Sequence, residues 1–478
     1  MASPNISFDN IPASIRKPGK YFEFNTKLAV RTLPTNLQRV IAIGQKMAAG
    51  SQLVNTIADI FSDAQAAALF GAGSQMHLLC QACIKANPYV ALSAIALDDA
   101  GGSVATTDTI TVTGPASGPG NLVATINGQD VQINFATGDT ATAMAAALVA
   151  EIAKIPALPV TAANALGVVT LTAKNKGTQG NQLKVYTALT PLSALAIGVT
   201  AAVADGVAGA TDPDINTALT TIFAAGHNII VSAWNDSVNL GKLRTHLDAV
   251  SGPQEQRGAI GVYAHTGTMG QATTLAGTLN SGRITGALLA TAPQLPLQVA
   301  GAYAGVIASE EDPARPLNTL GLTGILANPL ANWLGRVEQE NCLYNGVTPL
   351  EVGPGNRVQI VRAITTYTVD ASAVPDVSLL DLTTIRTLEY VRVACRTRIS
   401  LRFPREKLSE RTAAKVRSEL LDVLYKLEEL EIVEQVEANK TGLIVERDSQ
   451  DANRLDAKIP CDVVNGLHVF AGRIDLLL

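Results

Sequence analysis

Charged residues are scarce in this chain, at 16% of its 478 positions, whereas soluble proteins carry about 25%. Aromatic residues are also few, at 4%, while glycine is frequent, with 39 residues. A disordered chain needs high charge and low hydrophobicity, so a chain that is 47% apolar and poorly charged is excluded from that class. Interface cores are depleted in charge, which suggests that much of this surface lies against other subunits.

The charges that are present balance to a net −5. A nucleic-acid-binding protein normally has a basic excess, so this balance argues against that class. The length predicts about three domains. Five scattered cysteines, an odd number, indicate a reducing compartment without a disulfide framework.

Signals for secretion or membrane insertion are missing too. The first twenty residues are polar and contain prolines, so we expect no signal peptide. Two long uncharged stretches, 185–204 and 284–309, are rich in Ala, Thr and Gly rather than Leu, Ile and Phe. They therefore do not predict membrane-spanning helices.

Motifs for catalysis are absent or incomplete. Cys80 and Cys83 have a metal-ligand spacing, but no second pair accompanies them, and two core cysteines are the better interpretation. Gly71-Ala72-Gly73-Ser74 lacks the full phosphate-loop pattern and predicts a break in a helix instead. Asn280-Ser281-Gly282 could hold a serine nucleophile, yet no Asp and His are marked as its partners. The acidic residues Glu310-Glu311-Asp312 are most simply part of an exposed loop. For the chain as a whole, we expect no catalytic residue, cofactor or metal.

Buried strands alternate with helices in two separate parts of the chain. The apolar stretches predict strands near 37–44, 89–97, 227–234, 258–264 and 282–290, and helices over 62–86, 214–224 and 237–250. Continuous apolar strands separated by helices are typical of a parallel sheet covered on both faces. The sequence therefore predicts an α/β core over 26–100 and 207–345.

A segment with a different residue pattern, rich in strand and turn signals, interrupts this core. Asn127-Gly128, between alternating apolar residues, is the strongest hairpin signal in the chain. Thr140 begins a helix with one apolar stripe, and strands follow at 168–172 and 183–186, joined by the turn-rich residues 175–181. We interpret 101–206 as a β-rich domain inserted into a loop of the core, which should face outward and be dispensable for the core fold.

The last third predicts an α+β domain over 346–459. Strands are expected between 347 and 369, followed by an arginine-rich amphipathic stretch over 379–402 and a long helix that begins after Ser409. Both ends of the chain look like extended arms, 1–25 and 460–478. Each arm has strand-type residues that it cannot bury alone, so each is expected to pair with a sheet elsewhere.

Taken together, the sequence resembles the contractile tail sheath proteins of Mu-like phages over nearly its whole length. In the N-terminal part the resemblance rests on Pro4-Asn5-Ile6-Ser7-Phe8-Asp9-Asn10-Ile11-Pro12, on Arg16-Lys17-Pro18-Gly19-Lys20-Tyr21, and on Ala66 to Pro88 with Leu69-Phe70-Gly71 and Gly73-Ser74. In the insertion it rests on Ile126-Asn127-Gly128, Gly138-Asp139-Thr140-Ala141 and Ala173 to Asn181.

The resemblance implies a core of subtilisin-like fold without protease activity. It further implies a homo-oligomer of stacked rings that contracts by rigid-body rearrangement without nucleotide, with a tail tube protein, baseplate proteins and a tail terminator as partners. The expected location is the virion tail sheath, with the host cytoplasm during assembly, and neither nucleic acid nor membrane insertion is expected. The alternative from a different class is an α/β hydrolase with a β-rich accessory domain.

The two arms are the candidate functional segments. Strand addition supplies affinity through main-chain hydrogen bonds and register through alternating side chains. We expect the arms to pair with the C-terminal domains of adjacent subunits, although the tail could instead pair within its own chain. The arm residues expected at these contacts are Ile6, Phe8, Ile15, Tyr21, Phe22, Val469, Phe470, Ile474 and Leu476.

Overall fold

The computed structural model describes residues 16–22, 33–194 and 196–477, and these divide into two compact units. The larger, here the main unit, comprises 36–390, 431–434 and 461–477. The smaller, here the helical unit, is built mainly from 391–430 and 435–460. In the described residues no helix is both long enough and apolar enough to cross a membrane.

An eight-stranded sheet forms the centre of the main unit, with the strand order β15-β14-β13-β12-β11-β1-β3-β2. The six inner strands are parallel, and the edge strands β2 and β15 are antiparallel to their neighbours. The strands are β1 (Arg39–Gln45), β2 (Ile57–Ile60), β3 (Ala91–Leu97), β11 (Ile229–Ser232), β12 (Ile260–His265), β13 (Ile284–Leu288), β14 (Thr348–Gly353) and β15 (Arg357–Ile360). The predicted parallel sheet is thus confirmed, and its inner strands are almost entirely buried because helices cover both faces.

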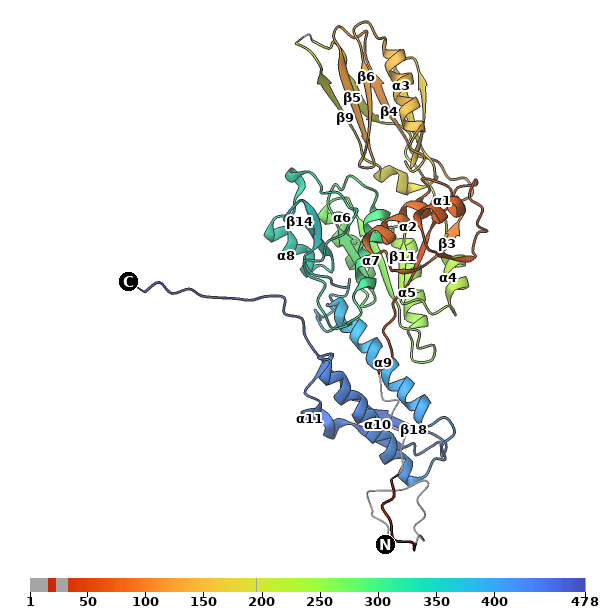
Figure 1. The fold of residues 1–478 in the computed structure, drawn as a ribbon, viewed down its shortest axis with the longest axis vertical. Helices are drawn as coiled ribbons and strands as arrows, with labels where there is room; N and C mark the ends of the chain where they lie inside the picture. The colour runs from red at the N-terminus through yellow and green to blue at the C-terminus, as the bar shows by residue number, and fades with distance from the viewer. Residues whose placement is uncertain (1–15, 23–32, 195, 478) are drawn as a thin grey trace. The chain divides into compact units, whose positions relative to one another are not determined.

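Two layers of helices enclose this sheet (Figure 1). One layer contains α2 (Gln75–Ala86) and α7 (Pro296–Ser309), and the other contains α4 (Asn216–Ile222), α5 (Ser237–Val250) and α6 (Met269–Leu279). Helices α2 and α7 pack very closely because α7 presents glycines to α2. A Cβ atom on Gly301 would lie 2.7 Å from the carbonyl oxygen of Leu79, so a larger residue there would force the helices apart.

The single helix predicted over 62–86 is two helices, α1 (Asp63–Phe70) and α2. Gly71 and Gly73 both have positive φ, which ends the first helix and turns the chain into the second. Ser62 and Ser74 cap the two helix starts by accepting hydrogen bonds from Gln65 N and His77 N. The predicted break at Gly71–Ser74 is therefore confirmed.

The segment between β3 and α4 has two small sheets and a hydrophobic cluster of its own. One sheet has the order β10-β4-β8-β7 and the other β6-β5-β9, with α3 packed against them. The elements are β4 (Thr107–Val112), β5 (Gly120–Ile126), β6 (Gln129–Phe135), α3 (Ala141–Ala153), β7 (Val160–Ala165), β8 (Val168–Ala173), the 3-10 helix η2 (Thr178–Gln182), β9 (Val185–Pro191) and β10 (Ala201–Asp205). The hairpin at Asn127-Gly128 is confirmed, with positive φ at both residues as a tight hairpin turn requires.

The main sheet extends beyond residue 345, the limit predicted for the core, because β14 pairs in parallel with β13 through Ala287 and Thr348. The predicted strands β14 and β15 therefore complete the central sheet instead of starting a new domain. Between β13 and the C-terminal helices lie α7, the 3-10 helix η3 (Leu330–Asn332) and α8 (Arg336–Tyr344), and α8 packs against β14.

The helical unit contains the long helix α10 (Glu410–Glu429) and the end of α9 (Leu382–Arg402), with a small β-hairpin. Its further elements are α11 (Val436–Asn439), the 3-10 helix η4 (Lys440–Gly442), β17 (Ile444–Arg447) and β18 (Leu455–Lys458). In the main unit, β16 (Val433–Glu434) pairs with β19 (Asp462–Val463). Residues 464–477 contain no strand in the single chain, so strand formation by the predicted tail 466–478 stays a prediction about an assembly.

Candidate assembly surfaces

The carboxyl ends of β1 and β11 form the point where the strand order of the sheet reverses. Enzymes with open α/β sheets bind their ligands in the crevice at such a point. Here the insertion occupies the crevice. Asn175, which is buried, donates from Nδ2 to the carbonyl oxygen of Lys46 at 2.9 Å and accepts from the backbone N of Gln75 at 2.9 Å. The N-terminus of α2 is therefore satisfied by an amide from the insertion.

A second group of amides closes the same crevice from the side of η2. Gln45, at the end of β1, donates from Nε2 to the carbonyl oxygen of Lys176 at 2.9 Å. Asn235, which follows β11, exchanges hydrogen bonds of 3.0 and 3.1 Å with the side-chain amide of Gln182. Through these contacts, residues of the insertion lie at the place where an α/β enzyme would hold its substrate.

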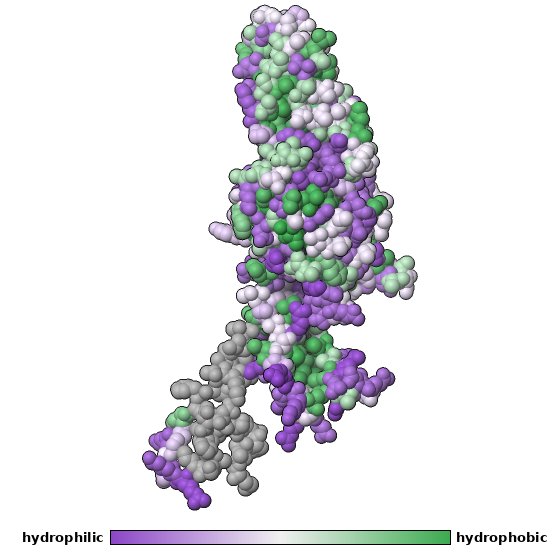
Figure 2. All heavy atoms as spheres, turned by 90° about the vertical axis from the view of Figure 1, so that its right-hand side faces the viewer, coloured by the Kyte–Doolittle hydropathy of each residue, from purple (hydrophilic) through white to green (hydrophobic). Residues whose placement is uncertain are grey.

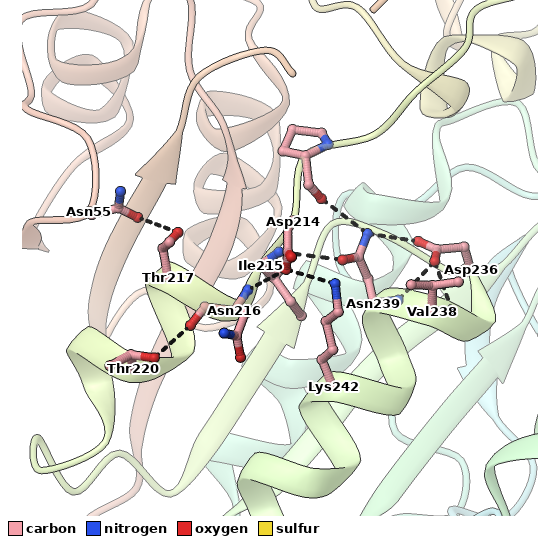
Figure 3. A network of polar contacts seen from close by, with 11 residues as sticks. Asn55, Asp214, Ile215, Asn216, Thr217, Thr220, Asp236, Val238, Asn239 and Lys242 are labelled. Atoms are coloured by element: carbon pink, nitrogen blue, oxygen red, sulfur yellow. Dashed lines mark hydrogen bonds and ion pairs between the residues drawn. The ribbon is translucent and has the colours of Figure 1, made fainter. Parts of the chain in front are cut away.

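The chain returns from the insertion to the core through a polar network, which Figure 3 shows. Asp214 forms an ion pair of 2.8 Å with Lys242 of α5, and this contact lowers the pKa of the Asp214 carboxyl. Asn239, one turn earlier on α5, donates to the carbonyl oxygen of Pro213 at 3.2 Å and accepts from Ile215 N at 3.4 Å. The returning segment is therefore anchored to α5 before α4 begins.

The residues considered for catalysis are structural in this fold. Cys80 and Cys83 are buried in α2, and burial raises the pKa of the Cys83 thiol to about 12, which disfavours a reactive thiolate. Ser281 is buried, and its hydroxyl accepts a hydrogen bond from Arg283 N at 3.2 Å. In the described residues no group of three or more His, Cys, Asp or Glu side chains has the arrangement of a metal site.

The C-terminal tail has two parts with different surroundings. Its first part is held to the main unit, where β19 pairs with β16 and Asn318 Nδ2 donates to His468 Nδ1 at 2.9 Å. Beyond His468 the predicted contact residues Val469, Phe470, Ile474 and Leu476 are all exposed, with Phe470 at 87% and Ile474 at 98%. So many exposed apolar side chains on one short segment are typical of a binding element.

The N-terminal arm is described only in part. Ile6, Phe8 and Ile15 lie outside the described residues. Tyr21 is partly exposed and donates from its hydroxyl to the carbonyl oxygen of Lys17 at 3.0 Å, whereas Phe22 is 88% exposed.

The helical unit offers a sheet to which a strand could be added. Strands β17 and β18 form a two-stranded antiparallel sheet, so each is an edge strand. A sheet of two strands is marginally stable alone. Here Arg417 of α10 supports β17 by donating from Nε to the carbonyl oxygen of Leu443 at 2.8 Å. This hairpin is therefore a candidate receiver for an arm of another copy.

Comparison with known proteins identifies the family. The model of the phage tail sheath protein central domain matches residues 208–366, and that of the phage tail sheath C-terminal domain matches residues 374–476. A Mu-like prophage FluMu tail sheath protein from Haemophilus influenzae is 34% identical over 489 residues, covering 99% of this chain and all of the relative.

Solved structures agree with this family in fold. A sheath tail protein from Desulfitobacterium hafniense aligns with a TM-score of 0.51 at 14% identity, covering 94% of this chain and 97% of the other. The contracted sheath complex of an extracellular contractile injection system aligns with a TM-score of 0.51 at 11% identity, covering 97% and 98% of the two chains. The chain therefore belongs to the phage tail sheath protein family, and it is a structural subunit of a Mu-like contractile tail sheath rather than an enzyme.

Proposed function

We propose that this subunit polymerises around a tail tube and that the sheath contracts by rigid-body rearrangement of subunits, driving the tube through the host envelope. The observation that carries the proposal is the full-length relationship to a tail sheath protein, combined with compact units and an exposed apolar tail. The sequence has no Gly-Lys-Ser/Thr phosphate loop, so contraction should need no nucleotide. The tube, the baseplate and the tail terminator are the proposed partners in the virion, with assembly in the host cytoplasm.

The finer description of the fold belongs to this proposal. The six parallel strands between two helical layers support a subtilisin-like core, and the separate hydrophobic cluster of the insertion supports its outward, accessory role. The proposed domains are the arm 1–25, the discontinuous core 26–100 and 207–345, the insertion 101–206, the C-terminal domain 346–459 and the arm 460–478. The position of β14 in the main sheet favours moving the end of the core beyond residue 353.

Subunits are proposed to be linked by their arms. The tail beyond His468 exposes Val469, Phe470, Ile474 and Leu476, and within the described part of the chain no further strand pairs with the hairpin β17–β18. Adding the tail of one copy to the hairpin of another would pair the edge groups and bury the apolar side chains. A flexible connection of this kind would let subunits rotate and slide while they remain joined.

Deletion of residues 466–478 tests this proposal. The deletion removes the contact of His468 with Asn318 but no residue of the main hydrophobic core, so we expect a folded, soluble monomer that forms no tubes. A double substitution, Phe470→Asp with Ile474→Asp, should have the same effect without shortening the chain. The control is Leu166→Asp, at an exposed turn of the insertion. Electron microscopy of the purified proteins gives the result, and normal tubes from the truncated chain would disprove the arm linkage.

A further inference from the structure

Two groups of exposed apolar side chains lie at opposite edges of the eight-stranded sheet. The first, here the β2 patch, lies on and beside the edge strand β2 and consists of Leu53, Val54, Ile57, Phe61 and Tyr89. The second, here the α8 patch, lies on η3 and α8 and consists of Leu330, Trp333, Val337 and Tyr344. Figure 1 shows α8 and β14 on the left of the sheet and β3, the neighbour of β2, on the right.

The β2 patch surrounds an edge that ends the sheet. Among the described residues strand β2 pairs with β3 only, and Phe61 directly follows it with 82% of its surface exposed. Tyr89 lies just before β3 and is 95% exposed. Because Ile60 pairs with Leu92, continuing the pairing would place Phe61 opposite Ala91, two residues from Tyr89. Figure 2 views the molecule from the side of this edge, and a hydrophobic area bordered by hydrophilic residues is visible at the level of the core.

The α8 patch places two apolar residues of α8 on one side of the helix. Val337 and Tyr344 are seven residues apart, so they lie on the same side of α8, and they are 82% and 79% exposed. The opposite side of α8 is buried, where Cys342 joins Leu288 and Val347 in a hydrophobic cluster. The helix is therefore packed on the sheet by its inner side. Glu340 and Asn341 lie between Val337 and Tyr344 on the outer side and are also exposed, so this face, which no described residue covers, carries apolar side chains beside polar ones.

The size of the patches suits contact between proteins. Phe61 and Tyr89 alone expose about 300 Å² of aromatic surface, and a standard interface buries about 800 Å² on each partner. The largest apolar patch on an ordinary monomer is about 300–600 Å² and is often functional. The β2 patch is thus large enough to form the centre of an interface.

The arrangement of the patches indicates which partner they fit. A self-complementary contact between two identical patches would close a dimer, whereas a ring or helix needs two different surfaces on each subunit. The two patches differ, and five intervening strands place them about 30 Å apart. We infer that in the assembled sheath the β2 patch of one copy packs against the α8 patch of the next copy. This inference rests on the proposed function and adds a contact between cores to the linkage by arms.

Photo-crosslinking in assembled tubes tests the inference. A benzoylphenylalanine at position 61 should attach to a peptide within 330–344, and one at position 344 should attach to a peptide within 51–63 or 87–91. Tubes grown from a mixture of ¹⁵N-labelled and unlabelled chains should give peptides with mixed labels, which proves attachment between copies. The control probe, at position 166 on the exposed β7–β8 turn, should attach to neither patch.

Substitutions give a second measurement. Phe61→Glu and Val337→Glu should each lower the yield of tubes at least tenfold while leaving the melting temperature of the monomer unchanged, because both side chains are exposed. In tubes of normal appearance, the probe at 61 could instead attach to another β2 patch, to the tail 466–477 or to its own chain. Any of these results would overturn this inference and leave the proposed function standing. An unmodified chain that never forms tubes would overturn the proposed function and this inference with it.

Discussion

Asn127 donates from Nδ2 to Oε1 of Gln298 at 2.9 Å, although one residue belongs to the hairpin turn of the insertion and the other to α7 of the core. The Oδ1 atom of the same Asn127 accepts from the backbone N of Leu295 at 2.8 Å, next to the start of α7. One turn residue therefore both shapes a hairpin through its positive φ and attaches the insertion to the core.

Replacing Asn127 with glycine separates these two roles. Glycine adopts the same positive φ, so the hairpin should persist, while the hydrogen bonds to Gln298 and Leu295 are lost. We expect a loss of about 1–3 kcal/mol in the free energy of unfolding. Hydrogen exchange should rise at the turn and at the first turn of α7. Leu166→Gly is the control, because Leu166 also has positive φ but is exposed. Equal effects from the two variants would argue against a docking role for Asn127.

Deletion of residues 101–206 tests whether the insertion is separable. Its hydrophobic cluster is distinct from that of the core, so a chain joined by a Gly/Ser linker should still fold. The core would lose the contacts of Asn175 and Lys176 at the end of β1. We therefore expect a stability about 2–4 kcal/mol below that of the corresponding core in the full chain. Circular dichroism and calorimetry measure both properties, and an unfolded product would show that the predicted boundaries are wrong.

Much of the fold follows from local sequence pattern. Strands such as Val40–Ile43 are continuous apolar runs, and Asn127-Gly128 is a turn signal that works without knowledge of the rest of the chain. The predicted helix over 237–250 matches α5. These features could be predicted because their causes lie within a few residues.

Other features depend on partners that are distant in the sequence. Asn175 looks like an ordinary turn residue, and only the fold brings it to Gln75, one hundred positions away. The short strand β2 has one fully buried apolar residue, Ile60, so its pattern is too weak to detect, and β14 joins the core only through pairing with β13. The sequence could not show that the apolar residues of the β2 and α8 patches are exposed. An apolar residue in a short strand or helix gives the same signal whether its side chain faces the core or the surface.

Two buried histidines should make the core sensitive to acid. Burial lowers the pKa of His227 and of His246 to about 4 in the folded chain, with the positive charge of Arg39 adding to the effect on His227 and Asp59 opposing it. In the unfolded chain both should titrate near 6.5. Between pH 6.5 and 4 the unfolded chain therefore binds more protons, so stability is fully present above pH 6.5 and falls as the pH falls.

The expected loss between pH 6.5 and 5 is about 1 kcal/mol for each histidine, after allowance for screening by solvent. His227→Leu with His246→Phe should flatten this part of the stability profile, and Phe at 246 can keep the edge contact with Phe223. Urea unfolding at a series of pH values measures the slopes. Above pH 6.5 the slopes of the variant and the parent chain should coincide, and an unchanged slope below it would contradict the assignment.

Arg398 should be the most sensitive position in the helical unit. Its buried guanidinium on α9 contacts Glu419 at 3.1 Å and Asp422 at 2.5 Å, both on α10. Glu419 also pairs with Arg402 at 3.5 Å and Asp422 with Lys426 at 3.4 Å, so Arg398→Ala removes the most buried cation of a network whose other cations remain. We therefore expect a loss of about 1.5–3 kcal/mol in the free energy of unfolding of that unit. The triple variant Arg398→Met with Glu419→Gln and Asp422→Leu removes these three charges together, but it also takes Glu419 from Arg402 and Asp422 from Lys426. It should therefore recover only part of the lost stability. Lys415→Ala is the control, because its ion pair with Glu406 is exposed and should contribute less than about 1 kcal/mol.

Urea unfolding followed by circular dichroism measures the stability of each of these variants. A small effect of Arg398→Ala, comparable to that of the control, would show that these charges do not hold α9 and α10 together.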